Sequence, residues 1–254
     1  MNKKPIIGFV SAPAWFDPAP SEFPEVVEED VRTQQAPLLL PEFDYRLESI
    51  ASVQNQLNHC ARSLKAIGCD LVVQVGSPFA WACARSESEA LLRNESMARA
   101  ANLPTVMTGL AIVNGLRSLG VKKVAVNCTY YETDWRDAFA AFLGMCGFEI
   151  LHVSTLSDQG LTESTAKMED YGWSMTHELT SRSILAVAEA SPAAEAIVVT
   201  GAGTRTLDIL SGLESQIKRP IIAADTILYW AIARELHLTL KPVMGSLANL
   251  AAIT

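Results

Sequence analysis

Short apolar runs rich in β-branched residues alternate with helical stretches along this chain of 254 residues. This alternation constrains the fold most strongly, because it is typical of parallel sheets covered by helices on both faces. Hydrophobic residues make up 49% of the chain, which is enough for a substantial core. The strands that we expect are Pro5–Val10, Leu71–Val75, Thr105–Met107, Lys123–Val126, Glu149–Val153, Ile197–Thr200 and Ile221–Ala224.

Two helices are predicted from apolar residues that recur at spacings of three and four. The first stripe consists of Ile50, Val53, Leu57, Cys60, Leu64 and Ile67. It places Cys60 in the core and leaves His59, which lies beside the stripe, at the surface. The second stripe consists of Trp135, Phe139, Phe142 and Cys146, with Gly147 as the expected end of the helix.

The second half of the chain resembles the first half. Leu71–Val75 is followed by a glycine turn and a helical stretch, and Ile197–Thr200 is followed by the same sequence of features. Such duplication predicts an α/β fold of two similar lobes, each with a parallel sheet flanked by helices. We place the division near Gly120, which gives an N-terminal lobe of residues 1–119 and a C-terminal lobe of residues 120–254. The C-terminal segment is a candidate to pack back on the first lobe.

Charge and cysteine spacing argue against several classes of partner. The net charge is −8, and Lys and Arg form no run that could follow a nucleic-acid backbone, so we expect no nucleic-acid partner. None of the five cysteines forms a C-x-x-C pair or has zinc-ligand spacing, so no metal is expected. An odd cysteine count without an export signal favours reduced thiols in the cytoplasm.

No run of about 18 apolar residues exists, so we expect no membrane span. The sequence leaves open whether the chain forms a homo-oligomer.

Ligands of parallel α/β sheets collect beyond the carboxyl ends of the strands, where the next helices direct their free N–H groups. At Gly76-Ser77-Pro78, glycine allows close backbone approach, Ser77 adds a hydroxyl donor and Pro78 suits a first helical turn. This turn could hold a carboxylate or an enediolate. The alternative is that Ser77 only caps a helix.

The corresponding turn of the second half is Gly201-Ala202-Gly203-Thr204, followed by Arg205. It offers the same backbone geometry with a hydroxyl and a guanidinium in the first turn. Arg205 could pair with a substrate carboxylate through two parallel hydrogen bonds. The alternative is a solvated residue on a helix surface.

Two further strand ends contain groups that could transfer protons. After Lys123–Val126, a tyrosine hydroxyl at Tyr130 or Tyr131 could donate to developing negative charge, or the ring could simply pack in the core. Asp225 follows Ile221–Ala224 and could act as a general acid or base if its environment raised its pKa. The alternative for Asp225 is a helix N-cap.

Taken together, these segments resemble the maleate isomerase and arylmalonate decarboxylase branch of the aspartate/glutamate racemase superfamily. The resemblance covers nearly the whole chain, and its motifs are Gly8-Phe9-Val10-Ser11-Ala12-Pro13, Gly76-Ser77-Pro78, Asn114-Gly115-Leu116-Arg117, Thr129-Tyr130-Tyr131, Thr204-Arg205-Thr206-Leu207-Asp208 and Trp230. It implies cofactor-independent chemistry on a small carboxylate through a planar carbanion or enediolate. It also implies that Ser77, Tyr131 (or Tyr130 in a shifted register) and the backbone around Gly203 hold the anion.

The usual catalytic cysteines of this branch are missing. Gly76 stands where the resemblance places the first cysteine, and Gly201 stands where it places the second. One interpretation is a displaced proton donor, either Cys128 or Asp225. A second is decarboxylation or related cleavage in which the anion hole lowers most of the barrier and Tyr131 or water supplies the proton. A third is a carboxylate-binding or sensor protein without catalysis.

A dinucleotide-binding oxidoreductase is a further alternative, since Gly201-x-Gly203 follows a strand and Asp225 lies at the end of the next one. Thr206 occupies the place of the third glycine of that fingerprint.

We therefore expect a cofactor-independent isomerase or lyase acting on a small carboxylic or dicarboxylic acid, with the anion hole between the lobes. Lyase chemistry is preferred because the paired thiols are missing.

Overall fold

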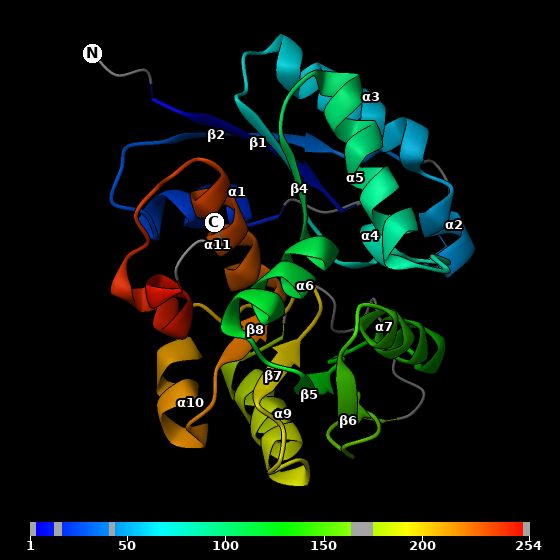
Figure 1. Ribbon diagram of the computed structural model, residues 1–254, viewed down its shortest axis with the longest axis vertical. Coiled ribbons are helices and arrows are strands. Elements are labelled where there is room, and N and C mark those ends of the chain that lie inside the picture. Colours follow the sequence, from blue (N-terminus) through cyan, green and yellow to red (C-terminus); the bar gives the residue numbers. More distant parts are fainter. Residues whose placement is uncertain (1–3, 13–16, 41–43, 164–174, 251–254) are drawn as a thin grey trace. The chain divides into compact units, whose positions relative to one another are not determined.

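The computed structural model describes residues 4–12, 17–40, 44–163 and 175–250, so Pro13 of the first resemblance motif lies outside the described residues. The chain divides into two compact units. The first is Met1–Ala111 with Leu228–Lys241, and the second is Ile112–Ile227 with Pro242–Thr254. Helices α6 (Thr108–Leu119) and α11 (Ala224–Glu235) each contribute residues to both units (Figure 1).

The first unit contains a parallel four-stranded sheet. Its strands are β1 (Ile6–Ser11), β2 (Arg32–Pro37), β3 (Leu71–Gln74) and β4 (Thr105–Met107), in the order β2-β1-β3-β4. All four residues of β3 are buried, as expected for a central strand covered on both faces. β2 is absent from the sequence prediction because its residues RTQQAP are mostly polar and lie at the sheet edge.

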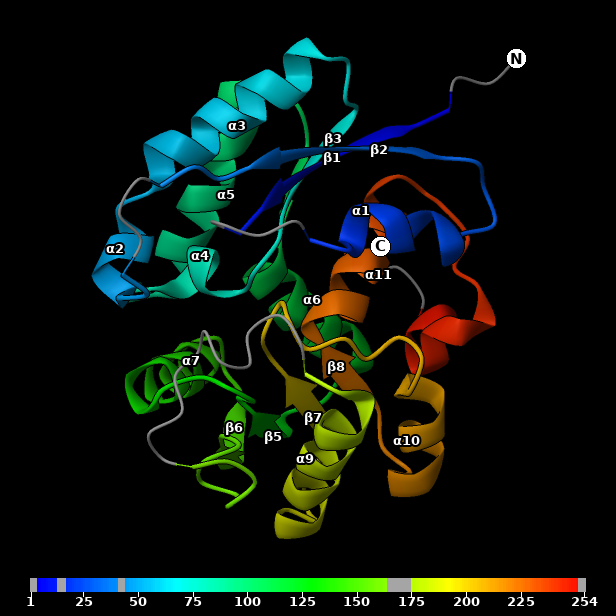
Figure 2. The same ribbon diagram turned by 180° about the vertical axis from the view of Figure 1, so that it is seen from behind.

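Helices cover both faces of the first sheet. They are α1 (Ala19–Glu22), η1 (Phe23–Glu25), α2 (Leu47–Ala51), α3 (Gln54–Ala66), α4 (Pro78–Trp81), α5 (Glu87–Ala101) and part of α11. Figure 2 shows α3 and α5 lying side by side on one face, with α1 and α11 on the other.

Successive side chains of β1 point to opposite faces of the sheet, so they pack against the helices on both sides. A β-carbon on Gly8 would lie 3.0 Å from the Leu64 β-carbon, so α3 approaches this strand closely. On the opposite face, the Phe9 ring contacts Phe23 of η1 at a centroid distance of 6.4 Å. Phe23 in turn contacts Tyr229 of α11 at 5.9 Å. The core of the first unit therefore lies on both sides of β1.

The long helix predicted from Ile50 to Ile67 is two helices, because the helical conformation is interrupted at Ser52, between α2 and α3. The Ser52 hydroxyl donates to the Ser49 carbonyl, a local bond that competes with helix continuation. Cys60 is buried and His59 is exposed, as predicted. Ile67 is 58% exposed, so its predicted place in the apolar stripe is wrong.

The second unit contains a second parallel sheet. Its strands are β5 (Lys123–Asn127), β6 (Glu149–Ser154), β7 (Ala196–Val199) and β8 (Ile221–Ala223), in the order β6-β5-β7-β8. The accompanying helices are α7 (Thr133–Met145), α9 (His177–Ala190), α10 (Leu210–Ile217) and η2 (Pro242–Asn249). One core cluster joins apolar residues of β5, β7 and β8 to residues of α9 and α10.

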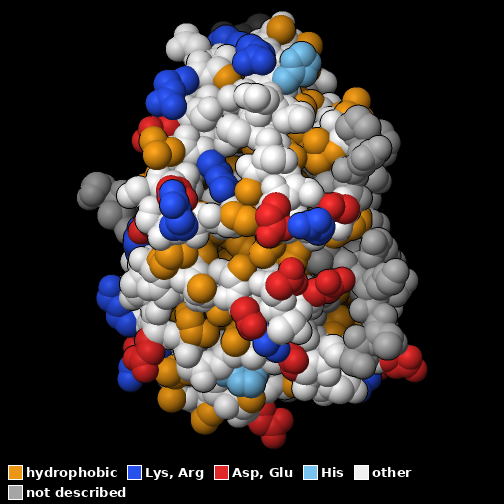
Figure 3. All heavy atoms as spheres, turned by 90° about the vertical axis from the view of Figure 1, so that its right-hand side faces the viewer, with side chains coloured by type: hydrophobic (Ala, Val, Ile, Leu, Met, Phe, Trp, Pro, Cys, Tyr) orange, Lys and Arg blue, Asp and Glu red, His pale blue; other side chains and the backbone are white. Residues whose placement is uncertain are grey.

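Both sheets have the same strand order along the chain, with the second strand at one edge, then the first, the third and the fourth. The predicted α/β fold of two similar lobes, each with a parallel sheet, is confirmed. Within the described ranges, no helix combines the length and the apolar character needed to cross a membrane. On the face shown in Figure 3, blue Lys and Arg side chains are interspersed with red Asp and Glu rather than gathered in a continuous strip.

Candidate active site

Two strand-end loops of the second unit meet because their strands are neighbours. β5 ends at Asn127 and β7 ends at Val199, and these two residues are partners in the sheet register. The backbone N–H of Thr200 donates to the Asn127 carbonyl at 3.0 Å. The sheet therefore holds the segments that follow, Cys128–Tyr131 and Gly201–Arg205, side by side at its carboxyl edge.

Thr129 has a strained backbone at the centre of this edge. Its φ of +44° lies in the left-handed region, which β-branched residues rarely adopt. Asn127 Oδ1 accepts the Thr129 N–H at 3.0 Å, and Thr129 Oγ1 donates to the Thr200 carbonyl at 2.9 Å. Strain of this kind costs about 1–3 kcal/mol and concentrates at functional sites. The sequence gives no signal for it, because Thr is not a typical residue for positive φ.

Gly201 has no room for a side chain. Its φ is +105°, and a β-carbon would lie 2.8 Å from Thr129 Oγ1 and 2.9 Å from both Thr204 Oγ1 and Tyr130 Cε1. Thr204 Oγ1 also donates to Thr129 Oγ1 at 3.3 Å. Hydroxyl groups therefore fill the space that a cysteine side chain at this position would need.

Both predicted tyrosines contact the loop that follows β7. The backbone N–H of Gly203 donates to the Tyr130 hydroxyl at 3.0 Å. The Thr200 hydroxyl donates to the Tyr131 hydroxyl at 2.6 Å. Both rings are buried, with exposed fractions of 9% for Tyr130 and 5% for Tyr131. The structure thus brings Tyr130, Tyr131 and Gly203 together.

Arg205 and Asp225 also contact this loop. Arg205 Nη1 donates to the Ala202 carbonyl at 3.3 Å. The buried Asp225 carboxylate accepts the Thr206 N–H at 2.6 Å and the Thr206 hydroxyl at 2.7 Å. These two bonds attach the start of α11 to the end of the loop. Asp225 therefore holds the loop in place through Thr206.

Cys128 lies next to this cluster in sequence, but its side chain is fully buried. Burial raises the pKa of the Cys128 thiol far above its ordinary value. The thiolate, which is the nucleophilic and proton-accepting form, is disfavoured in such surroundings.

In the first unit, the Gly76–Pro78 turn follows β3. Gly76 has a φ of +96°, and a β-carbon there would lie 3.3 Å from the Phe79 ring. Pro78 begins α4, and the buried Ser77 hydroxyl makes no capping bond to this helix. At Gly109, a β-carbon would lie 2.6 Å from the Ser77 carbonyl, so only glycine allows α6 to start so close to this turn. Gly109 is absent from the site residues predicted from the sequence.

Arg93 stabilises the short helix after this turn. Its guanidinium donates to the carbonyls of Phe79 and Ala80, each at 3.3 Å, and to that of Ala82 at 2.6 Å. Burial lowers the pKa of Arg93, yet guanidinium groups stay charged at any physiological pH. Arg93 thereby satisfies the free carbonyls at the end of α4.

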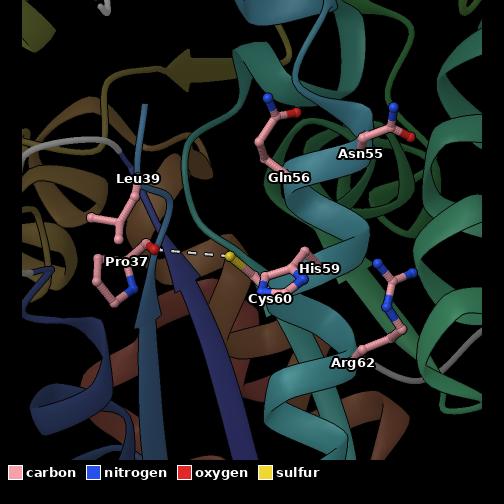
Figure 4. Close-up of a pocket in the computed structure, with 7 residues that line it drawn as sticks. All are labelled: Pro37, Leu39, Asn55, Gln56, His59, Cys60 and Arg62. Atoms are coloured by element: carbon pink, nitrogen blue, oxygen red, sulfur yellow. Dashed lines mark hydrogen bonds between the residues drawn. The ribbon is translucent and has the colours of Figure 1, made fainter. Parts of the chain in front are cut away.

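A separate pocket of about 320 Å³ lies in the first unit between the end of β2 and α3 (Figure 4). Within it, the Cys60 thiol donates to the Pro37 carbonyl at 3.8 Å. None of the predicted site residues is among its lining residues, which are Pro37, Leu39, Asn55, Gln56, His59, Cys60 and Arg62.

Comparison with known proteins identifies the family. A model of the arylmalonate decarboxylase family matches residues 7–247. Arylmalonate decarboxylase of Bordetella bronchiseptica is 28% identical over 186 residues, which is 72% of each chain. A crystal structure of arylmalonate decarboxylase superposes with a TM-score of 0.79 at 23% identity, covering 97% of this chain and all of that one.

The fold is also that of a maleate cis-trans isomerase from Nocardia farcinica, solved as a mutant with a covalently bound succinylcysteine intermediate. The TM-score is 0.79 at 17% identity, covering 98% of this chain and 100% of the isomerase. The fold, the order of the motifs and the match to the family model agree. This chain belongs to the arylmalonate decarboxylase family.

Proposed function

We propose that this protein is a cofactor-independent lyase that decarboxylates a small dicarboxylic acid of the malonate type. The supporting observation is the hydroxyl cluster around Gly201, the position where the resemblance places the second cysteine. Such preorganised donors stabilise negative charge as it develops in the transition state, and each is worth about 10²–10³ in rate.

In the proposed reaction, one carboxyl group leaves as CO₂ and its bonding electron pair stays on the neighbouring carbon. The remaining carboxyl group delocalises this pair as an enediolate. The hydroxyl cluster around Gly201 supplies the donors that we propose for it, and Arg205 orients the carboxylate that leaves.

A tyrosine then protonates the carbanion, and water restores the proton to the phenolate. We propose Tyr131 as the donor, with Tyr130 as the alternative. A Tyr131 phenolate would keep the hydrogen bond from Thr200, and a Tyr130 phenolate would keep the one from Gly203. Both hydrogen bonds favour the charged form that proton transfer leaves behind. Cys128 is a weaker candidate because its thiol is fully buried.

The test is a proton NMR screen in D₂O of substituted malonates, maleate and related diacids. We expect loss of CO₂ with one deuterium on the product carbon. Tyr131→Phe should slow turnover about 10²–10⁴-fold, because a positioned acid contributes that much. Tyr130→Phe serves as the comparison variant. Full turnover in both variants would reject a phenol as the proton donor.

A carboxylate-binding protein without catalysis is the second candidate, favoured by the glycines at both cysteine positions. It predicts ligand-dependent thermal stabilisation with no product from any diacid in the screen. Product formation by the wild-type protein would reject it.

A further inference from the structure

Asn127, at the end of β5, contacts both loops around Gly201 at once. Its side chain is fully buried. Its backbone carbonyl accepts the Thr200 N–H at 3.0 Å, and its Oδ1 accepts the Thr129 N–H, also at 3.0 Å. The Thr129 hydroxyl donates to the Thr200 carbonyl at 2.9 Å. Hydrogen bonds thus join Asn127, Thr129 and Thr200 in a closed ring at the carboxyl edge of the second sheet.

Ser183 of α9 fixes the orientation of the Asn127 amide. The Ser183 side chain is fully buried, and its hydroxyl lies 3.0 Å from Asn127 Oδ1. Because the Thr129 N–H can only donate, the amide atom that it meets is the oxygen, and Ser183 therefore donates to the same oxygen. The neighbouring Ile184 belongs to the core cluster that joins α9 to β5 and β7, so Ser183 is held by a close-packed part of the second unit.

The Asn127 amide offsets the unfavourable backbone conformation of Thr129. A side-chain oxygen that accepts the N–H two residues further along the chain stabilises a tight turn. Without this bond, the φ of Thr129 would relax from +44° to negative values, and its hydroxyl would move away from Gly201. The Thr129 hydroxyl also accepts from the Thr204 hydroxyl at 3.3 Å, so the placement of both hydroxyls depends on the Asn127 amide.

We infer that Asn127 and Ser183 are positioning residues, which hold the hydroxyl cluster around Gly201 in place through Thr129. This inference rests on the proposed function. Neither side chain needs to contact the substrate. Donors that are already in position require no reorganisation when negative charge develops, whereas a displacement of about 1 Å can cost about 10²-fold in rate.

A pair of variants at residue 127 differs only in one acceptor oxygen. Asn127→Ala leaves the Thr129 N–H without its acceptor, and Asn127→Ser restores an oxygen that can accept this N–H more weakly. With phenylmalonate as the substrate, Asn127→Ala should lower kcat about 10- to 100-fold and leave KM within about 3-fold. Asn127→Ser should have a kcat at least about 3-fold higher than that of Asn127→Ala. Equal kcat values for the two variants would overturn the inference.

A double variant tests whether Asn127 acts through Thr129. Thr129→Val removes the hydroxyl and keeps the β-branched shape. In this background, Asn127→Ala should change kcat by less than about 2-fold, because the hydroxyl that Asn127 positions is gone. A general loss of packing would lower kcat by the same factor in both backgrounds, and that result would contradict the positioning role.

Ser183→Ala tests the contribution of α9. It should lower kcat about 3- to 10-fold, since Asn127 Oδ1 then keeps only the bond from Thr129. Thr180→Val is the matched control, because Thr180 is also fully buried in α9 and its hydroxyl has no partner among the residues that the structure describes. Thr180→Val should keep the wild-type kcat. The same kcat in Ser183→Ala and Thr180→Val would overturn the role of Ser183.

A measurement without turnover separates this inference from the proposed function. The carbon-13 shifts of the Thr129 α- and β-carbons depend on its φ and are measured by NMR in each variant. If no malonate reacts, the proposed function fails, but the positioning role still predicts that Asn127→Ala moves these shifts to values typical of negative φ. Asn127→Ser should reverse part of the change. Shifts that stay at the wild-type values in Asn127→Ala, or in Ser183→Ala if Asn127→Ala does not fold, would overturn the inference.

Discussion

The Thr129 hydroxyl oxygen lies 2.8 Å from the position that a β-carbon on Gly201 would occupy. Thr129 reaches this place because its backbone adopts a φ of +44° and Asn127 accepts its N–H. The absence of a side chain at residue 201 is thus matched by a specific arrangement of neighbouring hydroxyls.

Gly201→Ala should lower the free energy of unfolding by roughly 2–5 kcal/mol. The substitution combines a positive φ that alanine disfavours with steric overlap against Thr129, Thr204 and Tyr130. Gly212→Ala is the control, because Gly212 lies within α10 and a β-carbon there meets no atom within 4 Å among the described residues. That variant should gain up to about 1 kcal/mol from helix propensity.

Urea denaturation of both variants measures these differences. Equal stability of Gly201→Ala and the wild type would mean that the neighbouring hydroxyls move aside easily. A cysteine at residue 201 would then be structurally acceptable, and the hydroxyl cluster could not be regarded as its replacement.

The five thiols should react at very different rates in the folded protein. Cys83 is exposed, whereas Cys128 is fully buried and its pKa is raised by burial. We expect a thiol reagent such as iodoacetamide to modify Cys83 first and Cys128 only in urea. Mass spectrometry of peptides after timed quenching assigns the sites. Rapid native modification of Cys128 would contradict its burial and restore it as a candidate proton donor.

Asp225→Asn separates a catalytic role from a positioning role. The asparagine keeps one acceptor for Thr206, so the free energy of unfolding should fall by about 1–2 kcal/mol, and Asp225→Ala should cost about 2–4 kcal/mol. If Asp225 only positions the loop, Asp225→Asn keeps the wild-type pH profile of kcat. A profile that loses one ionisation in Asp225→Asn would instead identify the carboxylate as an acid or base.

Acid should weaken the contact between α7 and the loop after β6. Burial raises the pKa of Asp158, but hydrogen bonds from Arg136 and Thr155 outweigh it and hold this pKa below its ordinary value of 3.8. A carboxyl group with a lowered pKa stabilises the fold above pH 3.8, and this contribution is lost as the pH falls through the folded-state pKa. Because the Asp158 side chain is 36% exposed, solvent screening limits the effect to about 1 kcal/mol or less.

Thermal unfolding of the wild type and Asp158→Asn between pH 6 and pH 3 measures this contribution. The Tm difference should be largest at pH 6 and should shrink toward pH 3. A constant difference over that range would show that ionisation of Asp158 does not contribute.

The sequence was sufficient to predict the fold because strand runs and helix stripes are local patterns. β1, β3 and the strands of the second sheet are apolar enough to be recognised. β2 was missed because an edge strand need not be apolar. The break at Ser52 was missed because the apolar spacing continues across it.

The site was harder to predict, since its contacts join distant parts of the chain. Thr129 and Thr204 are 75 residues apart, and nothing near either residue indicates their contact. Val10 and Gln74 are likewise neighbours only through the register of β1 and β3. Glycine turns mark strand ends in a sequence, but only coordinates show which polar atoms lie around them.

Decarboxylation by a cysteine-free variant tests most directly whether hydroxyls and amides replace the thiol. The substitutions are Cys60→Ala, Cys69→Ala, Cys83→Ser, Cys128→Ala and Cys146→Ala, and CO₂ release from phenylmalonate is followed by carbon-13 NMR. We predict that kcat/KM stays within about 3-fold of the wild type, since the proposed proton donor is a phenol. Loss of turnover by more than about 100-fold with an unchanged Tm, reproduced by Cys128→Ala alone, would contradict this mechanism.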